Sequence, residues 1–173
     1  NNTLGILGLG KLGLQVARVG LAFGMKVQAW SANLTPERCA ECGVVFASRE
    51  ELFATSDIVT VHLLLSDRTR GLIGATEFQM MKPTAYLVNT SRGPIVQESA
   101  LITALQAGAI AGAGLDVFDT EPLPQNHALR GLDNAVLTGH TGYVMRENYI
   151  TGYRGAVEAI NAWLNGEPVR LLN

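Results

Sequence analysis

Short apolar runs alternate along the chain with segments in which apolar residues recur at every third or fourth position. The runs predict strands at residues 4–7, 26–30, 44–47, 58–62, 86–89, 112–116 and 135–138. The periodic segments predict helices at residues 12–23, 36–42, 49–54, 76–81, 98–107 and 146–164. Strands that alternate with helices in this way form a parallel sheet with helices on both faces. We therefore expect an α/β fold, a doubly wound parallel sheet of about seven strands in three layers.

A glycine-rich turn, Gly8-Leu9-Gly10-Lys11-Leu12-Gly13, joins the first predicted strand to the first predicted helix. In a turn of this spacing the first glycine makes the tight turn and the second lets the backbone approach a pyrophosphate. The third lets the helix pack closely on the strand, and free N–H groups at the helix start hold the phosphates. The turn predicts a Rossmann-type dinucleotide site, although a merely structural turn stays open in a chain with 19 glycines.

The end of the second predicted strand bears on which dinucleotide binds. An NAD site usually has an acid there for the ribose 2′-hydroxyl, whereas this chain has Ser31 and Asn33. These neutral side chains do not repel a 2′-phosphate, and Arg38 and Lys11 are the nearby cations that would have to reach one. Because no cation is adjacent, NAD is favoured and NADP stays open.

Three late strands are followed by side chains suited to acid–base chemistry. Arg92 follows the fifth predicted strand, Glu121 the sixth and His140 the seventh. A guanidinium binds a carboxylate through two hydrogen bonds, and imidazole, with an unperturbed pKa of about 6.5, exchanges protons near neutral pH. Each residue alone also fits a plain role, as a surface arginine, a solvated acid or a structural histidine. Together, at the edge where α/β sheets bind ligands, they predict an active site.

Composition narrows the class of protein. The 173 residues are 47% hydrophobic and 16% charged, which is typical of a globular domain. A formal net charge of -2, without a basic cluster, argues against a nucleic-acid partner. Since the sequence shows neither an apolar stretch of membrane-spanning length nor a signal peptide, we expect a cytoplasmic protein with no membrane contact.

Cys39 and Cys42 form a CxxC pair, a spacing found in redox sites and in zinc sites. No second pair in the sequence completes four zinc ligands, so we expect no metal site. We interpret the two cysteines as small residues of a helix, one of them buried.

The Gly8–Gly13 turn and the segments 56–63, 69–73, 81–83, 89–93, 114–118 and 121–123 resemble motifs of the D-isomer-specific 2-hydroxyacid dehydrogenases. That family includes D-3-phosphoglycerate dehydrogenases, D-lactate dehydrogenases and glyoxylate/hydroxypyruvate reductases, and the resemblance runs nearly end to end. It implies hydride transfer between a nicotinamide cofactor and a small D-2-hydroxy acid or 2-oxo acid. It also implies that Arg92 clamps the substrate, that His140 is the acid/base, and that Glu121 hydrogen-bonds His140.

The resemblance further implies which residues line the cofactor, with Asp116 on the nicotinamide side. The expected cofactor-binding residues are Gly8, Gly10, Lys11, Leu12, Gly13, Ser31, Asn33, His62, Leu63, Thr69, Asn89, Thr90, Ser91, Arg92, Asp116, His140 and Gly142.

The family's domain organisation, carried over to this chain, gives a dinucleotide-binding domain at residues 1–144 and a C-terminal helix at residues 145–173. In the family that helix packs toward a substrate-binding lobe, most of which precedes the glycine turn. We therefore expect a fragment that binds nucleotide and turns over little substrate, taken from a parent protein that is a homodimer.

Two alternatives and one departure accompany this interpretation. Some relatives act as dinucleotide-sensing transcriptional corepressors, and such a non-catalytic role stays open. Formate dehydrogenases are disfavoured, because they carry Gln where this chain has Glu121. The family usually has Pro before the catalytic histidine, whereas Gly139 here predicts a looser backbone.

Overall fold

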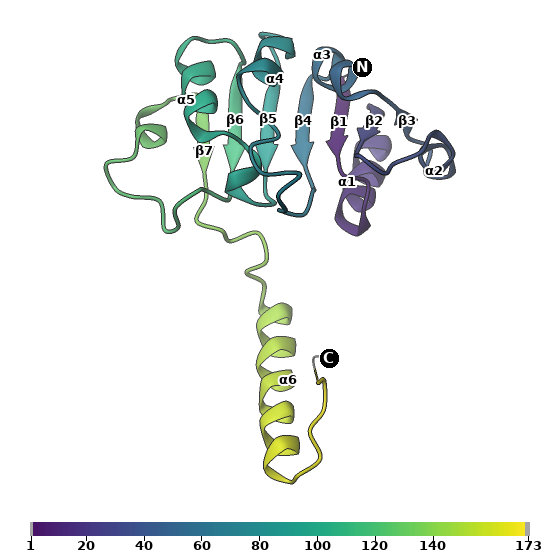
Figure 1. The fold of residues 1–173 in the computed structure, drawn as a ribbon, viewed down its shortest axis with the longest axis vertical. Helices are drawn as coiled ribbons and strands as arrows, with labels where there is room; N and C mark the ends of the chain where they lie inside the picture. The colour runs from purple at the N-terminus through teal and green to yellow at the C-terminus, as the bar shows by residue number, and fades with distance from the viewer. Residues whose placement is uncertain (1, 172–173) are drawn as a thin grey trace. The chain divides into compact units, whose positions relative to one another are not determined.

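Seven parallel strands form one sheet in the order β3-β2-β1-β4-β5-β6-β7 (Figure 1). The computed structural model describes residues 2–171. The chain runs outward from the centre to β3 and then returns to β4, beside β1. This reversal is the point at which open α/β sheets bind ligands, outside the carboxyl ends of the strands. The strands are β1 (Thr3–Leu7), β2 (Lys26–Trp30), β3 (Val45–Phe46), β4 (Ile58–Val61), β5 (Tyr86–Asn89), β6 (Gly112–Leu115) and β7 (Ala135–Leu137).

Helices cover both faces of this sheet. The helices of the sheet unit are α1 (Lys11–Ala22), α2 (Pro36–Glu41), α3 (Arg49–Thr55), α4 (Ala75–Met80) and α5 (Glu98–Gln106). In one core, Ala17 of α1 and Cys39 of α2 pack with Ile6 of β1. In the other, Phe53 of α3 and Phe78 of α4 pack with Leu7 of β1. Because Ile6 and Leu7 are successive residues of one strand, the two cores lie on opposite faces, which confirms the three-layer α/β prediction.

The predicted strands and helices all occur, with boundaries that differ by about one residue from the predicted ones. The largest difference is β3, where only Val45 and Phe46 pair with β2. Two 3-10 helices, η1 (Gly93–Ile95) and η2 (Ala128–Gly131), were not predicted. Each is one turn long, and one turn shows no hydrophobic period.

Helix starts follow local side-chain chemistry. The Thr35 hydroxyl accepts a hydrogen bond from the Arg38 N–H, ahead of Pro36 at the first position of α2. Ser48 and Glu51 form a reciprocal capping box at the start of α3. Cys39 and Cys42 are free thiols on and just after α2. Cys39 is buried in the core, which confirms the prediction that one of the two cysteines is buried, and this burial raises the pKa of its thiol.

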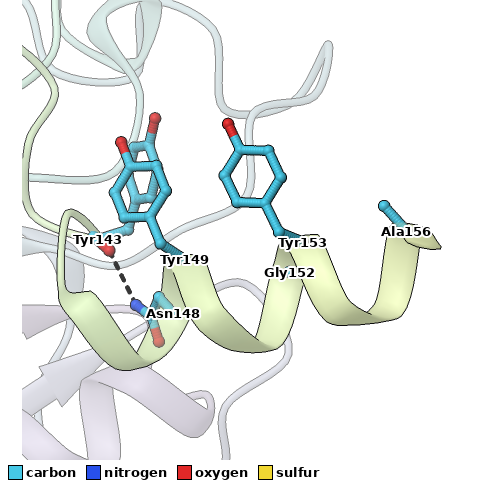
Figure 2. A pocket seen from close by; sticks show the side chains of 6 residues that line it. All are labelled: Tyr143, Asn148, Tyr149, Gly152, Tyr153 and Ala156. Carbon is cyan, nitrogen blue, oxygen red and sulfur yellow. Dashed lines mark hydrogen bonds between the residues drawn. The ribbon is translucent and has the colours of Figure 1, made fainter. Parts of the chain in front are cut away.

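Residues from Thr141 onward form a second compact unit, built on helix α6 (Arg146–Leu164). None of the residues of α6 is buried. The Tyr149 and Tyr153 rings stack with centroids 6.1 Å apart, and with Tyr143 they line a shallow apolar hollow of about 230 Å³ (Figure 2). Among residues 2–171, no helix has both the length and the hydropathy that a membrane crossing requires.

An ion pair ties α3 to α4 at the margin of the larger core. Arg49 Nη2 lies 2.6 Å from Glu77 Oε1, and Glu77 Oε2 accepts a hydrogen bond of 2.7 Å from the Gly74 N–H. Glu77 is buried and the Arg49 side chain is 31% exposed. Removal of one partner would leave the other charge partly buried without compensation, which is more costly than losing a surface pair.

We expect Glu77→Ala to lower the free energy of unfolding by about 2 kcal/mol in urea denaturation. This is below the value for a fully buried pair, because Arg49 keeps partial access to water. The matched control is Glu41→Ala, which breaks the exposed Arg38–Glu41 pair of 2.8 Å and should cause no measurable change. Equal losses in the two variants would contradict this account.

Candidate active site

The glycine turn after β1 is shaped by close backbone contacts. Gly8 has a φ of +96°, and a side chain there would also press on the His62 carbonyl oxygen. A Cβ on Gly13 would collide with the Gly8 carbonyl oxygen, so α1 could not lie this close to β1. At Gly10, by contrast, a Cβ would meet nothing within 4 Å. Gly8 and Gly13 are therefore required by the fold, whereas Gly10 leaves open space in front of α1.

That open space fits a dinucleotide pyrophosphate. Gly10 is the N-cap of the 12-residue helix α1 and makes no side-chain capping bond. Lys11 and Leu12, in the first turn, are exposed. The first N–H groups of a helix lack intrahelical acceptors and lie at its positive end. Phosphate oxygens can approach them through the gap that a side chain at position 10 would fill.

The end of β2 lies beside this turn, because the Gly8 N–H donates to the Trp30 carbonyl at 2.9 Å. Ser31 follows directly, and its carbonyl accepts from the Leu34 N–H at 3.0 Å in a turn that exposes Asn33. Arg38 pairs with Glu41 at 2.8 Å on α2. The end of β2 therefore presents neutral groups, with Arg38 engaged on its own helix.

The loops after β4 and β5 are joined by hydrogen bonds. The Ser91 hydroxyl donates to the Leu63 carbonyl at 2.5 Å, and His62 Nε2 lies 3.0 Å from the Thr60 hydroxyl. Burial lowers the pKa of His62, which favours its neutral form. The Thr69 hydroxyl donates to the Leu64 carbonyl at 2.7 Å. Of these predicted cofactor residues, Ser91 and Thr69 hold the loop backbone after β4 in place.

Asn89 shapes the turn that presents Arg92. Its buried side chain donates to the Arg92 carbonyl at 2.9 Å and accepts from the Ser91 N–H at 3.0 Å. Thr90, between them, is exposed. Arg92 is also exposed, and its Nη1 donates to the Ser91 carbonyl at 2.6 Å. The turn thus directs a cation outward from the end of β5.

Asp116 and Thr138 connect the ends of β6 and β7. Asp116 is buried, and its Oδ1 accepts from the Thr138 hydroxyl at 2.5 Å. A buried carboxylate needs such partners, because an uncompensated one would be costly. Gly142, also predicted to contact cofactor, belongs to the second unit.

Glu121 and His140 form the central pair of the site. His140 Nδ1 lies 2.6 Å from Glu121 Oε2, and Glu121 Oε1 accepts from the Phe118 N–H at 2.9 Å. The side chains are 35% and 34% exposed, so a small molecule can reach them. Burial opposes ionisation of Glu121, but the hydrogen bonds from His140 and Phe118 and the charges of His140 and Arg92 outweigh it. The pKa of Glu121 is therefore lowered.

His140 has a φ of +56°, a left-handed backbone conformation that is unusual for a residue with a side chain. Gly139 precedes it where the family usually has Pro, and a Cβ at Gly139 would meet nothing within 4 Å. The hydrogen bond between Glu121 and His140 is therefore present although residue 139 is Gly and not Pro.

Comparison with known proteins identifies the family. Residues 1–142 match the family model for the D-isomer specific 2-hydroxyacid dehydrogenase, NAD binding domain. The chain belongs to this dehydrogenase family. It is 45% identical over 172 residues to glyoxylate reductase from Aeropyrum pernix, covering 99% of this chain and 51% of that enzyme. The dehydrogenase domain described here thus spans about half the length of that relative.

Solved structures show the same fold. A phosphoglycerate oxidoreductase from Vibrio cholerae superposes with a TM-score of 0.91 at 36% identity, covering 96% of this chain and 53% of that one. D-lactate dehydrogenase with NAD+ from Lactobacillus jensenii gives a TM-score of 0.84 at 29% identity, covering 100% and 56%. The first is named as an oxidoreductase and the second as a dehydrogenase. The family's description as an NAD binding domain supports NAD as the cofactor.

Two alanine substitutions should separate the binding and folding roles of the glycine turn. We expect Gly10→Ala to weaken NADH binding about tenfold, or about 1.4 kcal/mol, because its methyl group occupies the phosphate space. Its stability should change little. Gly13→Ala should instead lower the free energy of unfolding by about 2 kcal/mol, because its Cβ pushes α1 away from β1. Fluorescence titration and urea denaturation measure the two effects, and equal stability losses would contradict the distinction.

The lowered pKa of Glu121 predicts a pH-dependent contribution to stability. A carboxyl whose folded pKa is depressed stabilises the fold above its unfolded pKa of about 4.3 and loses that effect as pH falls through the folded pKa. Thermal melts of the wild type and Glu121→Gln should therefore differ most above this range and converge on acidification. A constant difference from neutral to acidic pH would show that the carboxylate charge is not responsible.

Proposed function

We propose that this chain is the NAD-binding and proton-transfer half of an oxidoreductase that interconverts a small 2-oxo acid and its D-2-hydroxy acid. The observation that carries the proposal is the 2.6 Å contact between His140 Nδ1 and Glu121 Oε2. This accessible pair lies after β6 and β7, at the carboxyl edge that also carries the glycine turn. It supplies a proton donor where an NAD-dependent reduction needs one.

The cofactor site consists of the Gly8–Gly13 turn and the first turn of α1. Backbone N–H groups there hold the pyrophosphate, and Asp116 and Thr138 border the nicotinamide end. The reduced dinucleotide, when bound, supplies a hydride to the carbonyl carbon of the substrate. The side chains of this chain provide the proton and the charge stabilisation.

His140 protonates the substrate oxygen in the direction of reduction. Its Nδ1 is held by Glu121, and Nε2 is the nitrogen that delivers a proton as the carbonyl becomes a hydroxyl. In the direction of oxidation, Nε2 accepts the hydroxyl proton. Glu121 fixes the orientation of the ring through its contact with Nδ1.

Arg92 is the anion clamp. Its guanidinium offers paired donors to the substrate carboxylate and positive charge to the oxygen that becomes negative in the transition state. Asn89 holds the turn that presents it. A 2-oxo acid suits this site because one small molecule then offers a carboxylate to Arg92 and a carbonyl oxygen to His140.

The exposed apolar surfaces suit the rest of a larger protein. Exposed apolar residues of α6, among them Tyr153 and Ile160, pack on a substrate-binding lobe that completes the active site. Val19 of α1 and Phe23, the residue that caps this helix, are 56% and 82% exposed and suit contact with a second copy in a homodimer. The site of action is the cytoplasm.

A parallel titration with NADH and NADPH tests the proposal. NADH should bind the chain, and NADPH should bind more weakly, because Ser31 and Asn33 supply no cation for a 2′-phosphate. The chain alone should show no steady-state reduction of glyoxylate or hydroxypyruvate. With the substrate lobe attached, it should reduce a 2-oxo acid, and His140→Gln should lower kcat about 10²- to 10⁴-fold. Absence of NADH binding, or full activity of His140→Gln, would overturn the assignment.

A further inference from the structure

A cavity of about 410 Å³ adjoins the Glu121–His140 pair, and its wall includes a cation that belongs to no recognised motif of the chain. This cation is Arg130, at the end of η2, which lines the cavity with Leu123, Leu137 and Thr138. We propose that Arg130 is a positioning residue that fixes the loop carrying Glu121. The inference rests on the proposed function, in which Glu121 orients His140.

The Arg130 guanidinium donates hydrogen bonds to two successive carbonyl groups of that loop. Its Nε donates to the Pro124 carbonyl at 2.9 Å, and its Nη2 donates to the Leu123 carbonyl at 2.8 Å. Pro122 and Pro124 have no N–H, so the loop backbone has few donors with which to anchor itself. Its carbonyl groups are the available points of attachment, and one rigid fork holds two of them.

The backbone of Arg130 is itself held in place by contacts with the core and with α5. Leu129 is buried in the core, and the Arg130 N–H donates to the His127 carbonyl at 3.1 Å. His127 Nε2 lies 2.9 Å from Glu98 Oε1 on α5, and His127 Nδ1 accepts from the Leu129 N–H at 3.3 Å. A continuous series of contacts therefore leads from α5 through η2 to the loop of Glu121.

Each carboxylate oxygen of Glu121 has one contact, and both contacts depend on the conformation of this loop. One oxygen meets the Phe118 N–H and the other meets His140. Both bonds require the Glu121 backbone to stay in register with the end of β6. When the grip on residues 123 and 124 is lost, the carboxylate should sample positions in which one or both bonds are broken.

The titration of the Glu121 carboxyl, followed by its ¹³C resonance in the intact chain, reads this effect directly. In the wild type we expect a midpoint below the ordinary glutamate range, as the hydrogen bonds from His140 and Phe118 require. Arg130→Met removes the fork and keeps much of the side-chain volume, so the midpoint should rise toward the ordinary value. Arg130→Lys keeps the charge but loses the two-pronged geometry, and its midpoint should also rise.

Arg18→Met is the matched control, because Arg18 is an exposed arginine of α1 whose contact with Gln15 is 3.5 Å long. It should leave the Glu121 titration unchanged. A wild-type midpoint in Arg130→Lys, with a raised one in Arg130→Met, would mean that only charge matters and would overturn the positioning role. If Arg130→Met folds and its Glu121 midpoint does not move, the positioning role is overturned as well. If Arg130→Met does not fold, an unmoved midpoint in Arg130→Lys overturns it.

NADH titration of the same variants separates this inference from the proposed function. Arg130→Met should bind NADH with the wild-type Kd, because Arg130 lies outside the phosphate turn. Failure of the wild type to bind NADH would refute the proposed function and leave the Glu121 titration to decide the role of Arg130.

Discussion

The parallel alignment of the strands is the constraint on which the rest of this structure depends. Parallel strands place all their carboxyl ends at one edge, so the loops after β1, β4, β5, β6 and β7 emerge together. The central position of β1 then puts Gly8 against the backbone of His62 at the end of β4. This crowding demands glycine at position 8, and the close approach of α1 to the Gly8 carbonyl demands glycine at position 13 and brings the start of α1 to the same edge. The ligand site is a consequence of how the sheet is wound.

Buried polar side chains convert that edge into a defined surface. Asn89 and Asp116 are buried, yet each has hydrogen-bond partners, which offset the cost of removing them from water. The partners of Asn89 lie in the turn that directly follows it, whereas the bond from Thr138 to Asp116 fixes the ends of β6 and β7 relative to each other. Ser91 does the same between the loops after β4 and β5. These hydrogen bonds hold exposed groups such as Arg92 in fixed positions, which catalysis by orientation requires.

The sequence predicted the elements well because their signals are local. Apolar runs and helical spacing depend on a few neighbouring residues, and Arg92, Glu121 and His140 each follow a strand whose end the pattern locates. The contacts of Arg130 were out of reach, because they depend on how η2 folds back on residues 123 and 124. The same holds for Arg38, whose pairing with Glu41 is one of several that its sequence position allows. Local patterns locate side chains along the chain, whereas tertiary packing selects their partners.

The conformation of His140 shows why the Glu121 contact matters beyond its charge. A left-handed φ on a residue with a side chain costs on the order of 1–3 kcal/mol, and such strain persists only where surrounding contacts determine it. The hydrogen bond of 2.6 Å from Glu121 is one such contact, on the side chain of the strained residue. Gly139, in open space and without a Cβ, does little to restrict the backbone before it. In a chain with this glycine, the orientation of the imidazole must come from its side-chain partner more than from the preceding backbone. Glu121 then acts as a mechanical support and an electrostatic partner at once.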